Sequence, residues 1–173
     1  MLRPPWADAR LRSVSHPVLG RPPLDMTAAF PGAAERIRSD RARLGRDALE
    51  LLVSRDPTIR DRLGEDGLRA LLRDTEIYLE RIARSVGSGD PGQLAEWADW
   101  VVPVYRRRKV PLDDLVGLGQ ALRDVLSAAL GPEEQAAAEA AIAAAARVFR
   151  WHRRLAGDAR RRNPYLDAIY RGA

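Results

Sequence analysis

The sequence contains no cysteine. This absence excludes disulfides, thiolate nucleophiles and sulfur-ligated metals, and it is compatible with a reducing compartment. Long hydrophobic runs are also lacking: no window approaches the ~18 uncharged apolar residues of a membrane span, and residues 1–12 have no apolar signal-peptide core. We therefore expect a soluble, cytoplasmic protein with no membrane partner.

Residues that carry catalysis or bind cofactors are also scarce. The only histidines are His16 and His152, and no Glu-x-x-His pair of the kind that builds di-metal sites in helical bundles occurs. Gly117-Leu-Gly119 follows no strand and has no phosphate-loop lysine, so it predicts close helix packing rather than a nucleotide loop. No nucleophile, base and metal ligand cluster together. The sequence therefore predicts a protein that is not an enzyme and needs no cofactor or metal.

A chain of 173 residues with 46% hydrophobic content can bury one ordinary core. Six prolines and no apolar period predict an extended proline-rich arm over residues 1–32. A helical bundle is expected over 33–157, followed by a basic C-terminal turn over 158–173.

The apolar spacing predicts helices throughout the bundle and no strand of useful length. One helix runs from 33 to the Asp56-Pro57 step, and a short turn at 57–63 precedes a helix over 68–86. Asp90-Pro91 starts the next helix, Pro111 another, and Pro132 the last, which ends near 157. The fold class is all-α, an antiparallel bundle of four to five long helices.

Positive charge concentrates near the C-terminus. Residues 147–173 hold eight arginines against Asp158 and Asp167, a local net charge of +6, whereas the whole chain carries +5. A second basic run ends a predicted helix, where cations also complement the helix dipole. Both runs are candidate partner-binding sites, and their residues are Arg106, Arg107, Arg108, Arg153, Arg154, Arg160, Arg161 and Arg162.

Two further side chains are candidates for binding. Trp97 shares the apolar face of its helix with Val101, whereas Trp100 is displaced from that face and could line a groove or an interface. His152 follows Phe149 by one turn and could face a pocket and ligate a haem iron. Its alternative interpretation is a partly exposed residue at the border of the basic face.

One motif resembles a known family. Asp90-Pro91 leads to Trp97, Trp100 and Tyr105, and then come Arg108-Lys-Val-Pro-Leu-Asp-Asp-Leu115 and Leu122-Arg-Asp-Val-Leu126. Over about residues 35–155 this pattern resembles the helical N-terminal domain of RsbR-type co-antagonist proteins of bacterial stress signalling. The resemblance implies a haem-free, globin-like domain that dimerises and serves as a sensory or interaction module.

We therefore expect a non-enzymatic helical sensor or adaptor that homodimerises and binds an acidic partner protein or a small apolar ligand. One alternative is a nucleic-acid-binding accessory protein that uses the basic C-terminal segment. The other alternative is a tetrapyrrole-binding sensor that uses His152.

Overall fold

The computed structural model describes residues 28–156 and contains helices but no strand in that range. The all-α prediction is confirmed. No helix of the described range is long and apolar enough to span a membrane. The helices are α1 (Pro31–Ser39), α2 (Arg41–Arg55), α3 (Thr58–Ser88), α4 (Gly92–Arg107), α5 (Leu112–Leu126) and α6 (Pro132–Ala156).

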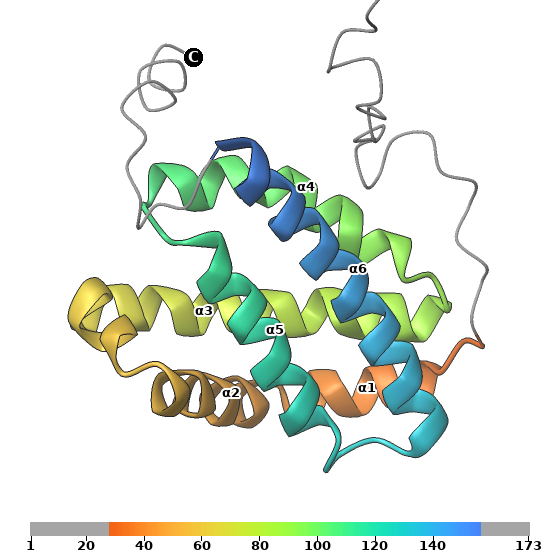
Figure 1. Cartoon of the computed structure of the whole chain (residues 1–173). Helices are drawn as coiled ribbons and strands as arrows, with labels where there is room; N and C mark the ends of the chain where they lie inside the picture. The colour runs from red at the N-terminus through yellow and green to blue at the C-terminus, as the bar shows by residue number, and fades with distance from the viewer. Residues whose placement is uncertain (1–27, 157–173) are drawn as a thin grey trace, which may run out of the picture.

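Helix α3 crosses the middle of the molecule, with α1 and α2 on one side and α4 on the other (Figure 1). Helices α3 and α4 form an antiparallel pair, and so do α5 and α6. Helix α6 packs along α4 and α5, and its middle also contacts α3. One continuous core of buried apolar side chains joins all six helices.

Asp-Pro steps start two of the helices, as the sequence predicts. The Asp90 carboxylate accepts a hydrogen bond from the Gly92 N–H at 2.8 Å, and Asp56 accepts one from the Thr58 N–H at 3.2 Å. Gly89 ends α3 in the left-handed conformation, with φ 71°. Such a residue lets the chain reverse sharply, and it sets α4 beside α3.

Helix boundaries near the N-terminus differ from the prediction. The first helix begins at Pro31, inside the predicted arm, and the single helix expected from residue 33 to the Asp56-Pro57 step is divided at Asp40. Asp40 has φ −94° and ψ 5°, which ends α1 and starts α2. The Asp40 carboxylate caps no backbone N–H there and instead accepts a hydrogen bond from Arg43. The predicted break after residue 63 is present as a kink at Gly64 inside α3.

Small residues set the spacing between helices. A Cβ at Gly117 would lie 3.1 Å from Leu52, and one at Gly119 would lie 3.2 Å from both Ile142 and the Tyr78 hydroxyl. These contacts confirm that the two glycines of α5 allow close packing. The alanines of α6 act in the same way, since Ala138, Ala141, Ala144 and Ala145 are buried.

Two of the predicted segments fall largely or wholly outside the described residues. They are most of the proline-rich arm, through residue 27, and the basic turn at 158–173, which includes Arg160, Arg161 and Arg162. The predicted division of the chain at these places therefore stays a prediction.

Candidate functional site

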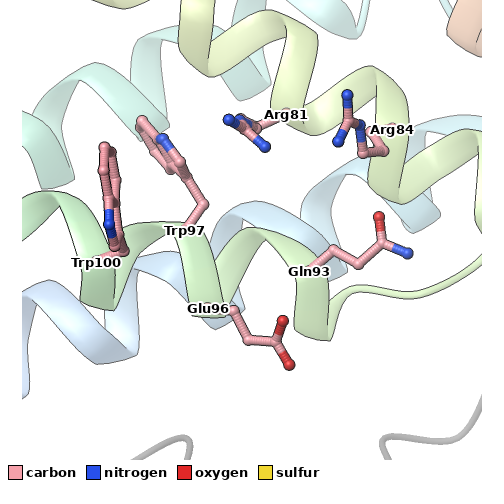
Figure 2. Close-up of a pocket in the computed structure, with 6 residues that line it drawn as sticks. All are labelled: Arg81, Arg84, Gln93, Glu96, Trp97 and Trp100. Carbon is pink, nitrogen blue, oxygen red and sulfur yellow. The ribbon is translucent and has the colours of Figure 1, made fainter.

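An open groove of about 570 Å³ lies between α3 and α4. Figure 2 shows two arginine side chains that enter it from α3 and two indole rings that rise from α4. The groove is lined by Arg81, Arg84, Gln93, Glu96, Trp97 and Trp100. Its volume lies within the range of about 300–1,000 Å³ that is usual for small-molecule sites.

The two tryptophans of the groove are held differently. Trp97 is 7% exposed, and its ring lies 5.0 Å from the buried ring of Tyr78. Trp100 is 71% exposed, although a tryptophan of a folded protein is normally well buried. The prediction that Trp97 lies on the apolar face of its helix and Trp100 lies off that face is confirmed. Trp97 forms a fixed wall, and Trp100 presents a free aromatic face.

Arg81 and Arg84 differ from most arginines on this surface. Within residues 28–156, neither side chain makes a hydrogen bond or ion pair with another residue. Many other arginines pair with carboxylates, as in Arg55–Asp124, Arg108–Asp74 and Arg153–Asp113, although exposed ones such as Arg46 and Arg107 do not. Two unpaired cations beside an exposed indole can receive an anionic, flat ligand.

A second depression, between α1, α2 and the end of α5, has a similar size of about 600 Å³. Its arginines are already neutralised, because Arg36 pairs with Glu134, and Arg43 pairs with Asp40 and Asp47. No large aromatic side chain lines it. Of these two depressions in the described range, the groove between α3 and α4 is the one that combines unpaired cations with an exposed aromatic ring.

Burial changes the acidity of two tyrosines, Tyr78 beneath the groove and Tyr105 near the end of α4. Tyr78 lies below Trp97, and burial raises its pKa above the ordinary value. Burial also raises the pKa of Tyr105 on α4; the Asp74 carboxylate adds to the increase, and Arg108 opposes it. Both phenols therefore stay neutral around pH 7 and act as packing groups rather than bases.

The predicted basic run at the end of α4 is partly used inside the molecule. Arg106 donates to the carbonyl oxygen of His152 at 2.9 Å, and Arg108 donates to Asp74 at 2.6 Å and lies over the Tyr105 ring. Lys109 adopts φ 58° in the tight turn that follows. Arg107 and Lys109 are exposed. The run is therefore a helix end that also holds neighbouring elements together.

His152 lies between α6 and α4, away from the groove. Its Nε2 is 2.6 Å from Oδ1 of Asp99, and its ring meets the Trp151 ring edge-on. The contact occupies one of the two ring nitrogens through which a histidine can ligate an iron. Among residues 28–156, no group of three or more His, Asp or Glu side chains is arranged to hold a metal ion.

Long-range ion pairs were missed by the sequence analysis. The Asp114 carboxylate, only 1% exposed, accepts two hydrogen bonds from Arg62, at 2.9 and 3.0 Å. Arg153 and Arg154, both predicted as partner-binding residues, are exposed, and Arg153 lies 2.6 Å from Asp113.

The lining residues of α3 were missed as well. Arg81 and Arg84 stand three residues apart on a charged helix face, and such a face is normally solvated. Gln93 and Glu96 carry no special pattern either. Of the predicted site residues, Trp100 lies in the groove, and Arg106, Arg107, Arg108, Arg153, Arg154 and His152 do not line it.

The family described as "Phycobilisome protein" matches residues 27–170, which is most of the chain. The resemblance to RsbR-type proteins is therefore wrong; it rested on a loose helical motif that different globin-like domains share. The globin-like, all-α fold stands. No curated protein and no solved structure matches the chain.

Proposed function

This chain belongs to the phycobilisome protein family, and we propose that it binds an open-chain tetrapyrrole, a bilin, without a covalent bond. The proposed site is the groove between α3 and α4. The observation that carries the proposal is the pairing of a free indole face, Trp100, with two unpaired arginines in one groove. A bilin is a flat conjugated chain with two propionate groups, so its chemistry complements both features.

Covalent attachment does not fit this chain. A thioether bond to a bilin requires a cysteine thiol, and none occurs among the 173 residues. Binding must therefore rest on stacking and ionic contacts, which are reversible. Trp97 and Trp100 would provide the apolar contact, since aromatic pairs contribute about 0.5–1.5 kcal/mol beyond the area they bury.

The proposal modifies the earlier functional interpretation. It keeps a non-enzymatic binding protein, and it retains the tetrapyrrole alternative with the site moved from His152 to the groove. It departs from the expectation that no cofactor is bound. The sensor or adaptor interpretation rested on the RsbR-type resemblance, and neither the family nor the groove supports signalling. Homodimerisation through Trp100 stays a prediction.

The test is direct binding of biliverdin to the purified 173-residue chain. We expect pigment to elute with the protein in gel filtration and to separate from it completely under denaturing conditions, because no covalent bond holds it. Trp100→Ala should weaken binding about tenfold, the equivalent of about 1.4 kcal/mol. Trp151→Phe is the matched control, since Trp151 lies on α6 and does not line the groove.

Absence of pigment in the protein peak at tens of micromolar protein would refute the proposal. Equal affinity of the Trp100→Ala variant and the wild type would place the ligand elsewhere.

A further inference from the structure

We propose that the end of the molecule where α4, α5 and α6 meet binds the phosphate backbone of duplex DNA, whatever its base sequence. Four exposed cations, which we call the basic end, carry the proposal, and they are Arg107, Lys109, Arg150 and Arg154. The inference is independent of the groove between α3 and α4, because none of the four residues lines that groove.

Two contacts and one turn bring the segments of the basic end together. Arg106 of α4 donates a hydrogen bond to the carbonyl oxygen of His152 on α6 at 2.9 Å. Arg153 of α6 lies 2.6 Å from Asp113 in the first turn of α5. The turn that holds Lys109 joins α4 directly to α5. The end of α6 therefore lies against both the end of α4 and the start of α5 (Figure 1).

The four cations are not neutralised within the described part of the chain. Among residues 28–156, none of their side chains makes a hydrogen bond or an ion pair. Nearby carboxylates are already engaged, and these pairs are Arg108–Asp74, His152–Asp99 and Arg153–Asp113, each with an N–O distance of 2.6 Å. The positive charge of the basic end is therefore open to a partner that brings negative charge.

Helix-dipole compensation does not account for the cations of α6. A cation at a helix C-terminus complements the dipole, but the effect falls off within the last turn. Arg150 stands six residues before Ala156, the last residue of α6, and that distance exceeds one turn. Arg150 and Arg154 are four residues apart, so they are neighbours on one face of the helix. They form a short row of positive charge on the surface.

The side chains around the basic end favour a phosphate backbone over a protein partner. Protein interfaces have an apolar centre that is poor in charge, and Leu155 is the only large apolar side chain exposed on the described part of α6. Single-stranded nucleic acid also needs aromatic side chains on which its bases stack. The exposed Trp100 stands seven residues, about 10 Å along the helix, before Arg107. Duplex DNA needs neither feature, because its phosphates supply a dense row of charges.

The experiment measures binding of labelled DNA duplexes by fluorescence anisotropy over a series of salt concentrations. Two duplexes of equal length and unrelated sequence are compared. Two double variants each remove two charges, and they are Arg107→Gln with Lys109→Gln and Arg150→Gln with Arg154→Gln. The matched control removes the same charge from exposed sites on α2 and α3, by Arg46→Gln with Arg69→Gln. Vesicles of phosphatidylcholine and phosphatidylserine are the comparison ligand, since basic surfaces also attract anionic lipids.

We expect the wild type to bind both duplexes equally, because contacts to phosphate carry no sequence information. Affinity should fall steeply with salt, since each contact releases about one counterion. Each double variant removes two contacts, so it should reduce the slope of log affinity against log salt by about 1.8. At about 0.1 M salt, the same loss weakens binding at least about tenfold. The control pair should leave the slope unchanged.

Unchanged salt slopes in both double variants would overturn the assignment to the basic end. A strong preference for one of the two duplexes would overturn recognition through phosphates alone. Tighter binding to the vesicles than to DNA would overturn the choice of partner in favour of a lipid surface. The wild-type slope needs no variant, so a slope near zero would overturn the inference even if a substitution impairs folding.

Discussion

The groove is distinguished by two unpaired arginines that lie beside an exposed tryptophan. Exposed ion pairs such as Arg60–Glu65 contribute little to stability, yet they reduce the free positive charge. Arg81 and Arg84 remain available, and the exposed Trp100 lies beside them. The proposed function therefore rests on side chains that have no partner among residues 28–156.

Tyr78 and Tyr105 should ionise only above the ordinary tyrosine pKa of about 10, because burial disfavours the phenolate. From about pH 10 upward the unfolded chain releases these protons while the folded chain keeps them. Stability is thus fully present below pH 10 and falls as pH rises further. Tyr78→Phe should reduce this alkaline loss, measured by urea unfolding at pH 8 and pH 11.

Absorbance at 295 nm follows the same tyrosines directly. The chain has four tyrosines, and we expect the late phase of ionisation to coincide with loss of helical circular dichroism. A single titration near pH 10 with unchanged helicity would contradict the burial of Tyr78 and Tyr105.

Asp114→Asn should destabilise the fold by about 2–3 kcal/mol, because it leaves Arg62 without its buried carboxylate partner. The estimate lies below the cost of breaking a fully buried pair, since Arg62 is partly exposed. Thermal and urea unfolding measure the change. Glu65→Gln is the control and should have almost no effect, because the Arg60–Glu65 pair is exposed. Equal stability of the two variants would show that the Arg62–Asp114 pair does not hold α3 to α5.

At the level of helices, the predictable boundaries are those with a local chemical cause. Asp56-Pro57, Asp90-Pro91 and Gly89 fix helix ends through capping and backbone conformation, and the sequence reveals them. The division at Asp40 has no proline or glycine to signal it. The groove is also invisible in the sequence, because it depends on which residues of α3 and α4 face each other across the helix pair.

Gly64→Ala should destabilise the protein by about 1–3 kcal/mol. Gly64 has φ 63° and ψ −178°, a conformation that is essentially restricted to glycine. No neighbouring atom lies within 4 Å of the added Cβ, so the cost is backbone strain alone. Gly32→Ala is the control: its nearest contact would be at 3.8 Å, and it should be neutral or slightly stabilising in thermal unfolding. Equal melting temperatures for both variants would argue against the kink.

At the level of the whole molecule, composition and helical periodicity were enough to predict an all-α fold, but they did not identify the family. Helices with similar apolar spacing occur in many unrelated domains, so a basic turn followed by Val-Pro-Leu could not separate RsbR-type proteins from phycobilisome proteins. The absence of cysteine, in contrast, was directly informative. It now restricts any bilin to reversible binding.

The measurement that tests the account most directly is the ¹H–¹⁵N correlation spectrum of the chain during titration with biliverdin. We predict that the perturbed amides cluster on the groove walls, around residues 81–84 of α3 and 93–100 of α4. Amides of α2 around Arg46 should remain unperturbed and serve as the internal reference. An unchanged spectrum, or changes centred on His152 and the end of α6, would contradict the proposal that an open-chain tetrapyrrole binds between α3 and α4.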